Sequence, residues 1–250
     1  MRYDRPLVLS IAGFDPCGGA GVLADMKTVE QHRCLGLAVT TCMTEQVEDK
    51  FISVLWLPAR DIIQAIKGLT DHYEIDVVKI GLIENLDTLY EVVTFLKEQQ
   101  KRSIIWDPVL ASSSGFDFKQ TIDPAKLIAI LKAVFLITPN VDEAKKLSGL
   151  NSIQDAAAYL AEHCQVLLKG GHSETEKGTD HLFWQGQQLK IGPATAFELA
   201  PKHGSGCILS AAIASQLALK QDLATACQKA KRYVEERLNS NSNLLAYHVA

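Results

Sequence analysis

The 250-residue sequence has no excess of charge of one sign and no long hydrophobic run. Its 25 Lys and Arg residues nearly balance its 29 Asp and Glu residues, and the basic residues are scattered along the chain. Proteins that bind nucleic acid or an anionic membrane surface gather basic residues in one patch. The apolar stretches also fall short of the length that a membrane span needs. We therefore expect neither nucleic acid nor a membrane as a partner.

The sequence also lacks the motifs of several common sites. Its six cysteines include no Cys-x-x-Cys pair, and its histidines show no His-Glu-x-x-His spacing, so no zinc or thioredoxin-type redox site is expected. A Walker-type P-loop is absent. The apolar run near the amino terminus is too short for the core of a signal peptide. These absences predict a cytoplasmic protein whose cysteines stay reduced.

Short apolar segments alternate with segments of helical periodicity along the chain. Strands are expected at residues 7–12, 38–43, 76–80, 103–106, 135–138 and 166–169. Helical spacing of apolar residues lies between them, as at residues 62–69 and 89–96, and again near the end. Strands that are apolar on both faces belong in a parallel sheet covered by helices. We expect one α/β domain over residues 1–250, with three α/β/α layers, a mostly parallel sheet and a polar tail from about residue 239.

One segment departs from this alternation. Residues 181–184 and 188–191 are separated by Gln185-Gly186, a pattern that predicts a small antiparallel hairpin or flap.

Glycine and polar residues follow each of the six expected strands. Ligands of open parallel sheets bind beyond the carboxyl ends of the strands, so these residues should converge on one rim. In chain order they are residues 13–21, Glu45-Gln46, Gly81, Asp107-Pro108, Pro139-Asn140 and Gly170-Gly171-His172.

The segment Gly204-Ser205-Gly206-Cys207 leads directly into an apolar helix. Small residues at a helix start leave N–H groups free, as a developing phosphoryl charge requires. Cys207 would lie in the first turn, where the helix dipole lowers a thiol pKa and could prepare it to accept a proton. The alternative is an ordinary glycine–serine helix start with a packed, inert cysteine.

Three other candidates each allow two interpretations. Asn140 and Glu143 have the spacing of a capping box, but Glu143 could also reach a magnesium-bound water or a phosphate oxygen. Asp107 could face a cation at the rim or simply cap a loop. Lys169 could bind nucleotide phosphates beside the bare backbone of Gly170 and Gly171, or lie exposed beside a tight turn.

A dinucleotide motif is also present. Gly19-Ala20-Gly21-Val22-Leu23-Ala24 matches the loose pattern Gly-x-Gly-x-x-Gly/Ala, with Glu45 near the distance of a ribose-binding acid, which would indicate a dehydrogenase. However, residues 13–18, which include a proline, separate it from the first strand, whereas the Rossmann turn is immediate. We interpret it as a chance match.

Taken in order, the segments resemble the hydroxymethylpyrimidine and phosphomethylpyrimidine kinases of thiamine synthesis, within the ribokinase-like superfamily. The resemblance covers nearly the whole chain. Its most specific parts are Ser10-Ile11-Ala12-Gly13, Asp15-Pro16, Gly18-Gly19-Ala20-Gly21, Ala24-Asp25, Lys27-Thr28, Lys79-Ile80-Gly81, Asp107-Pro108-Val109, Ile137-Thr138-Pro139-Asn140 with Glu143-Ala144, Leu168-Lys169-Gly170-Gly171-His172 and His203-Gly204-Ser205-Gly206-Cys207.

The resemblance implies a ribokinase-like fold, a homodimer, and transfer of a phosphoryl group from ATP, with Mg²⁺, to 4-amino-5-hydroxymethyl-2-methylpyrimidine and then to its monophosphate. It also implies site residues. The residues that it implies for substrate binding are Gly13, Asp15, Gly19, Ala20, Asp25, Gln46 and Leu82. Nucleotide binding falls to Thr138, Asn140, Lys169, Gly170, Gly171 and His172, and the metal to Asp107 and Glu143. Gly204, Ser205, Gly206 and Cys207 would form the anion hole and the catalytic base.

Three positions depart from the family pattern. Residues 45–48, Glu-Gln-Val-Glu, replace the usual Ala-Gln-Asn-Thr and add charge beside the expected ring pocket. Ser113 stands where a lysine that could help the second phosphorylation is common, and Lys202, where Thr is usual, could partly compensate for it. A pyridoxal kinase and a non-catalytic pyrimidine-binding protein remain as alternative interpretations.

Overall fold

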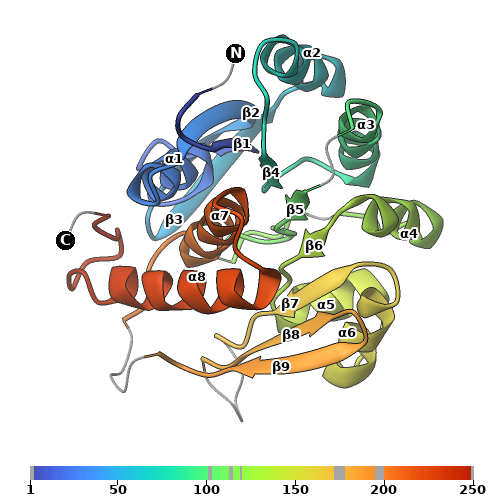
Figure 1. Cartoon of the computed structure of the whole chain (residues 1–250), viewed down its shortest axis with the longest axis vertical. Helices are drawn as coiled ribbons and strands as arrows, with labels where there is room; N and C mark the ends of the chain where they lie inside the picture. The colour runs from blue at the N-terminus through green and yellow to red at the C-terminus, as the bar shows by residue number, and fades with distance from the viewer. Residues whose placement is uncertain are drawn as a thin grey trace.

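A nine-stranded sheet forms the centre of the molecule in the computed structural model, which describes residues 3–100, 103–112, 115–118, 120–171, 178–194 and 200–248 (Figure 1). Its order is β3-β2-β1-β4-β5-β6-β7-β8-β9. The strands are β1 (Leu7–Phe14), β2 (Leu35–Val47), β3 (Lys50–Trp56), β4 (Val77–Ile80), β5 (Ile104–Trp106), β6 (Leu136–Ile137), β7 (Gln165–Leu168), β8 (Asp180–Trp184) and β9 (Gln187–Ile191). Strands β2, β1, β4, β5, β6 and β7 are parallel, so the expected mostly parallel sheet is confirmed.

Helices cover both faces of this sheet, which gives the expected three layers (Figure 1). The described residues form α1 (Gly21–Gln31), α2 (Ala59–Thr70), α3 (Leu86–Glu98), α4 (Pro124–Ala133), α5 (Val141–Ser148), α6 (Ile153–Ala161), α7 (Ser205–Ala218) and α8 (Leu223–Leu238). One buried core lies between the sheet and α2 to α6, and a second lies between the sheet and α1, α7 and α8.

Alternate residues of the central strands enter opposite cores. Val78 and Ile104 lie in the core beneath α2 to α6, whereas their neighbours Val77 and Ile105 lie in the core beneath α1, α7 and α8. Successive side chains of a strand point to opposite faces, so a strand covered on both sides must be apolar throughout. This requirement explains why the inner strands are largely apolar, with Ser10 of β1 and Lys79 of β4 as buried polar exceptions.

The β2–β3 hairpin differs from the prediction. The sequence predicts a strand at residues 38–43, but β2 extends to Val47 and pairs antiparallel with β3, which was not expected. Strand β3 is largely solvent-exposed, and its apolar residues include the exposed Ile52 and Leu55, so it lacks the alternation of a half-buried strand. Gln46 therefore lies within a strand and does not follow one.

The opposite edge of the sheet agrees with the prediction. Strands β8 and β9 pair antiparallel with each other, and β8 pairs antiparallel with β7, as expected for the hairpin. Among the helices in the described part of the chain, none has the length and apolarity needed to cross a membrane.

Candidate active site

The first turn of α7 lies against the glycine loop of residues 13–21. Its N-cap residue, Gly204, has a left-handed φ of 74°. A Cβ atom at this position would lie 2.0 Å from the carbonyl oxygen of Gly19, so only glycine fits. No side chain of the described residues caps α7, and its first turn has no acidic residue. The backbone N–H groups of Ser205, Gly206 and Cys207 are therefore suited to an anion.

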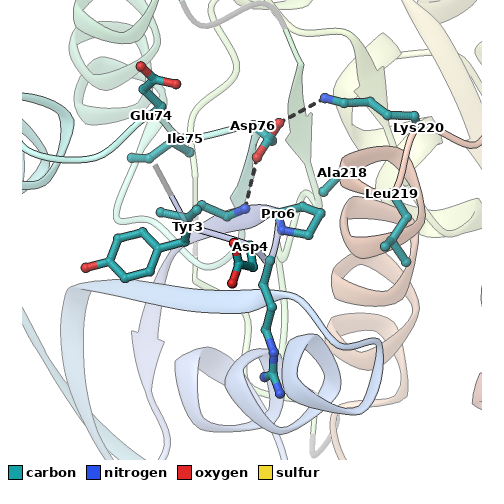
Figure 2. Close-up of a pocket in the computed structure, with 11 residues that line it drawn as sticks. Tyr3, Asp4, Pro6, Glu74, Ile75, Asp76, Ala218, Leu219 and Lys220 are labelled. Atoms are coloured by element: carbon teal, nitrogen blue, oxygen red, sulfur yellow. Dashed lines mark hydrogen bonds and ion pairs between the residues drawn. The ribbon is translucent and has the colours of Figure 1, made fainter. Parts of the chain in front are cut away.

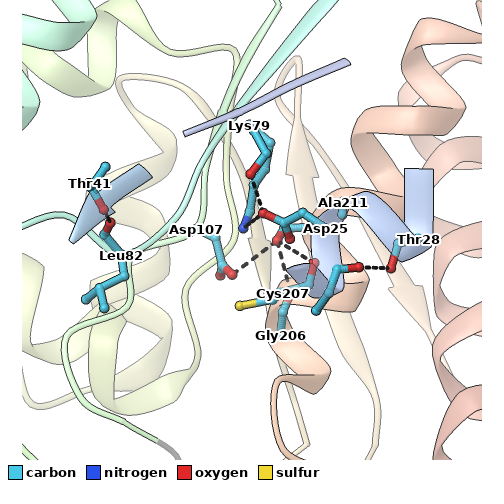
Figure 3. A network of polar contacts seen from close by, with 12 residues as sticks. Asp25, Thr28, Thr41, Lys79, Leu82, Asp107, Gly206, Cys207 and Ala211 are labelled. Atoms are coloured by element: carbon cyan, nitrogen blue, oxygen red, sulfur yellow. Dashed lines mark hydrogen bonds and ion pairs between the residues drawn. The ribbon is translucent and has the colours of Figure 1, made fainter. Parts of the chain in front are cut away.

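Side chains from two strand ends and from α5 meet at this turn. A Cβ atom on Gly206 would lie 3.4 Å from Lys169 Nζ and 3.8 Å from Asp107 Oδ2. Lys169 Nζ in turn lies 2.8 Å from Asp107 Oδ1 and 3.7 Å from Glu143 Oε2. Figure 3 shows Asp107 facing Gly206 and Cys207. The predicted convergence of these side chains at one rim is confirmed.

Asp107 is buried, and both of its carboxylate oxygens have donors. Thr138 Oγ1 and Lys169 Nζ donate to Oδ1, and Ser210 Oγ donates to Oδ2 at 3.1 Å. Burial alone would raise the pKa of Asp107, but Lys169 and Lys79 hold it below its ordinary value. The sequence analysis missed Ser210. The feature that could have identified Ser210 is a hydroxyl within the apolar helix α7, one turn after Gly206.

The capping-box interpretation of Asn140 and Glu143 is confirmed, and the contact of Glu143 with magnesium-bound water or phosphate stays a prediction. The Asn140 side chain accepts from the Glu143 N–H at 2.8 Å, and Glu143 Oε2 accepts from the Asn140 N–H at 2.7 Å, which is a complete capping box. The same Glu143 carboxyl faces Lys169. Burial, with a contribution from Asp107, raises the pKa of Glu143 to about 7 against the opposing effect of Lys169. Glu143 therefore changes charge near neutral pH.

The thiol of Cys207 does not have the lowered pKa expected from the sequence. Burial raises the pKa of Cys207 to about 11; Lys79 opposes this, whereas Asp25 and Asp107 add to it. The expectation is wrong because loss of hydration outweighs any stabilisation of the thiolate by the helix terminus. The thiol is protonated at neutral pH.

A second lysine–carboxylate pair lies beneath the turn. The Oδ2 atom of Asp25, in α1, accepts hydrogen bonds from Lys79 Nζ at 2.8 Å and from Ser10 Oγ at 2.5 Å (Figure 3). Both Asp25 and Lys79 are fully buried, and Asp25 Oδ1 has no hydrogen-bond partner among the described residues. Lys79 belongs to the segments that carry the family resemblance, but no site role was predicted for it. The feature that could have identified it as a site residue is its charge within the otherwise apolar strand β4.

Asp15 organises the glycine loop. Its carboxylate accepts from the N–H groups of Cys17, Gly19 and Ala20, at 2.8 to 3.1 Å, and from the Cys17 thiol. It also contacts His203 Nε2 at 3.0 Å. Burial by itself would raise the pKa of Asp15, but these hydrogen bonds, that of His203 first, lower it to about 2. Asp15 is therefore ionised and fully used within the protein.

The other residues predicted for the substrate lie beside this loop. A Cβ atom on Gly13 would lie 3.2 Å from the Leu82 side chain. Gln46 Nε2 donates to Thr44 Oγ1, which donates to the carbonyl oxygen of Phe14, each at 2.9 Å. Gln46 thus stays close to the glycine loop although it belongs to β2.

The backbone closes a narrow neck after Lys169. Gly178 N donates to the Gly170 carbonyl at 3.0 Å, and Gly170 N donates to Asp180 Oδ1 at 2.8 Å. A Cβ atom on Gly170 would lie 1.7 Å from the Thr179 carbonyl oxygen, so the close approach requires glycine. Gly171 is exposed just beyond this neck.

Lys202 does not compensate for the missing lysine. Its amine is buried and donates to the carbonyl oxygens of Asn241 and Asn243 in the carboxyl-terminal segment. The expectation is wrong because this segment folds back over Lys202 and provides it with acceptors. Ser113 and His172 lie outside the described residues.

A cavity of about 450 Å³ lies away from this rim (Figure 2). It is lined by residues at the amino-terminal ends of β1 and β4, including Leu7 and Asp76, and by Ala218 at the end of α7. Asp76 and Lys220 form an ion pair there. Ligands of parallel sheets bind at the other ends of the strands, so this cavity is not the candidate active site.

Comparisons of the sequence with known proteins identify a family, and the similar solved structures include members of it and pyridoxal kinases. Residues 15–250 match the family described as phosphomethylpyrimidine kinase. A hydroxymethylpyrimidine/phosphomethylpyrimidine kinase of Aquifex aeolicus is 32% identical, covering 95% of this chain and 96% of the relative. The crystal structure of phosphomethylpyrimidine kinase from Clostridium difficile 630 is similar, with a TM-score of 0.77 and 28% identity over 93% of this chain and 99% of that one. A Staphylococcus aureus pyridoxal kinase in complex with ADP has a TM-score of 0.80 and 25% identity over 98% and 92% of the two chains.

Proposed function

Because this chain belongs to the phosphomethylpyrimidine kinase family, we propose that it transfers a phosphoryl group from ATP to 4-amino-5-hydroxymethyl-2-methylpyrimidine and to its monophosphate, in thiamine biosynthesis. The chain is a phosphotransferase with a ribokinase-like fold. The choice of this rim as the phosphoryl-transfer site rests on one observation. Lys169, Asp107 and Glu143 meet beside an uncapped helix start, which provides a cation, two carboxylates and backbone donors within reach of one phosphate chain.

The nucleotide phosphates would lie between Lys169 and the first turn of α7. Only 15% of the Lys169 side chain is exposed, so the amine is nearly desolvated and its interaction with a phosphate is strong. The N–H groups of residues 205–207 would stabilise the transferring group, and sites of this kind contribute about 10²–10³ in rate. Thr138, Asn140, Gly170, Gly171 and His172 complete the proposed nucleotide side.

Asp107 and Glu143 fit a magnesium ion. Their carboxylate oxygens are the donors that Mg²⁺ prefers, and both carboxyls already contact the same cation, Lys169. Burial is the main cause of the raised pKa of Glu143 and Asp107 adds to it, so an added cation would favour the ionised carboxylate. Bound there, the ion would neutralise part of the negative charge of the phosphates.

The substrate side would consist of Gly13, Asp15, Gly19, Ala20, Asp25, Gln46 and Leu82, with Cys207 facing the hydroxymethyl group. Asp15 would act by shaping the glycine loop, because its oxygens are already occupied by protein donors. To act as the base, Cys207 would first have to lose its own proton, because burial raises the pKa of its thiol to about 11 although Lys79 opposes this. Replacement of Cys207 by Ala should then lower kcat, and a variant with full turnover would remove this role.

The first experiment is to incubate the purified protein with Mg-ATP and the pyrimidine, and to separate mono- from diphosphorylated product by mass spectrometry. Diphosphate would support both steps, and monophosphate alone would restrict the proposal to the first. The same assay with pyridoxal is the control. A higher kcat/KM for pyridoxal would overturn the substrate assignment, and no product from either compound would favour a non-catalytic binding role.

We also infer a homodimer that acts in the cytoplasm. Apolar side chains of the β2–β3 hairpin are exposed, among them Leu55 (68%), Ile52 (50%) and Met43 (45%), and an apolar face of this kind fits burial against a second copy. All six cysteines are free, as expected in a reducing compartment. Sedimentation of wild type and Leu55→Lys tests the dimer. A monomeric wild type would contradict it.

A further inference from the structure

His203, the residue before the first turn of α7, is buried where it contacts both the glycine loop and the carboxyl-terminal segment. Its Nε2 atom lies 3.0 Å from Asp15 Oδ2, and only 6% of the residue is exposed. Because the carboxylate of Asp15 is ionised, the imidazole donates this hydrogen bond. His203 therefore joins the glycine loop to the start of α7 through a charge-assisted contact.

The two backbones also touch at this point. A Cβ atom on Gly204 would lie 2.0 Å from the Gly19 carbonyl oxygen, and a Cβ atom on Gly19 would lie 2.6 Å from the His203 ring. Packing this close allows little independent movement of the loop and the turn. A displacement of the His203 ring would therefore displace both the glycine loop and the first turn of α7.

The other side of His203 is held by the carboxyl-terminal segment. The His203 N–H donates to the Leu244 carbonyl at 2.9 Å, and the preceding Lys202 donates to Asn241 O at 2.6 Å. This segment has its own fixed shape, because Asn241 Nδ2 donates to the Leu245 carbonyl at 2.9 Å. We call residues 241–245 the strap.

We propose that His203 is a positioning residue: the strap and Asp15 hold it from opposite sides, and it sets the place of the Gly204–Cys207 donors relative to the substrate loop. This inference rests on the proposed kinase function. Donors that stabilise a transferring phosphoryl group must be placed closely, since a displacement of about 1 Å can cost about 10²-fold in rate. No atom of His203 needs to contact the substrate.

The test compares two replacements that differ in reach. The amide nitrogen of glutamine can take the place of Nε2 and donate to Asp15, whereas that of asparagine stops short. We expect His203→Asn to lower kcat by about 10- to 10²-fold while KM for the pyrimidine changes less than about threefold. His203→Gln should stay within about threefold of wild type. Equal kcat in His203→Asn and wild type, or equal loss in both variants, would overturn the proposal.

A second variant decides the matter if His203→Asn does not fold. Lys202→Met keeps the length of the side chain but removes its hydrogen bonds to the strap, and we expect kcat to fall about three- to tenfold. Lys220→Met, at the remote cavity, is the matched control and should retain wild-type kcat. Wild-type kcat in Lys202→Met would overturn the role of the strap. Inactive wild-type protein would instead refute the proposed function, so the two failures are distinguishable.

Discussion

Two buried lysine–carboxylate pairs flank the first turn of α7, and their surroundings differ. In the pair of Lys79 and Asp25, both side chains are inaccessible to solvent, and one carboxylate oxygen has no partner among the described residues. In the pair of Lys169 and Asp107, the lysine is partly exposed at the rim, both carboxylate oxygens have donors, and Glu143 lies nearby. We call them the closed pair and the open pair.

The comparison shows that identical charges can be used in two ways. In the closed pair both ions are buried, so we expect its loss to act first on stability and on the field around Cys207. The proposed substrate contact of Asp25 would have to use its Oδ1 atom, which has no hydrogen-bond partner among the described residues. In the open pair the lysine can contact a phosphate while Thr138 and Ser210 continue to satisfy Asp107. Exposure and additional donors, more than charge, separate the closed pair from the pair that we propose to act in catalysis.

The strongest test breaks the closed pair. Lys79→Met leaves Asp25 as a buried charge with Ser10 as its one remaining donor in the described part of the chain, so we expect the free energy of unfolding in urea to fall by about 3–5 kcal/mol. The double variant Lys79→Met/Asp25→Asn is the control, and it should recover part of this loss because no charge is isolated. A loss below about 1 kcal/mol would contradict the structural role of this pair.

Breaking the open pair should affect activity more than stability. Lys169→Met is expected to lower kcat by about 10²–10³. The free energy of unfolding should fall less than in Lys79→Met, since two hydroxyls still donate to Asp107. Steady-state kinetics and urea denaturation on the same preparations measure both. Unchanged kcat with a large loss of stability would erase the distinction between the pairs.

The free energy of unfolding should also depend on pH through Glu143, which lies beside the open pair. Its pKa is about 7 in the folded protein and near its ordinary value of 4.5 when unfolded, so the folded state binds more protons between these values. Its contribution to stability is present in full below pH 4.5 and is lost as the pH rises through 7. Relative to Glu143→Gln, the wild type should therefore lose about 2–3 kcal/mol between pH 5 and pH 8. A constant difference across this range would show that Glu143 is not shifted.

The smallest effect is expected at Ser210. Ser210→Ala removes one donor to Asp107 but leaves Lys169 and Thr138, so the free energy of unfolding should fall by about 1–2 kcal/mol. Thermal unfolding of this variant, beside Ser215→Ala as a second buried serine of α7, measures the difference. If Ser210→Ala were the less destabilised of the two, the hydrogen bond to Asp107 would have little energetic value.

Much of the central fold could be predicted because it is encoded locally. The inner strands are apolar on both faces and the polar residues come directly after them, so both the sheet and the rim were visible in the sequence. Strand β3 was not, because an exposed edge strand needs no buried face and its pattern depends on pairing with β2.

The site was predicted in part for the same reason. Asp107, Lys169 and Glu143 follow strands, and topology alone brings them together. The partners of Lys79 and Lys202 depend on segments distant in the sequence, α1 for one and the strap for the other. The pKa of Cys207 depends on how completely packing removes water, which no local motif records.

The closed neck at Gly170 and Gly178 has a consequence for the position of Lys169. The Gly178 N–H contact with the Gly170 carbonyl, and the bond from Gly170 to Asp180, join the end of β7 to the start of β8 independently of the residues between them. Lys169, directly after β7, is therefore held in place from the β8 side as well, so substitutions that keep Gly170 and Asp180 should leave its position unchanged.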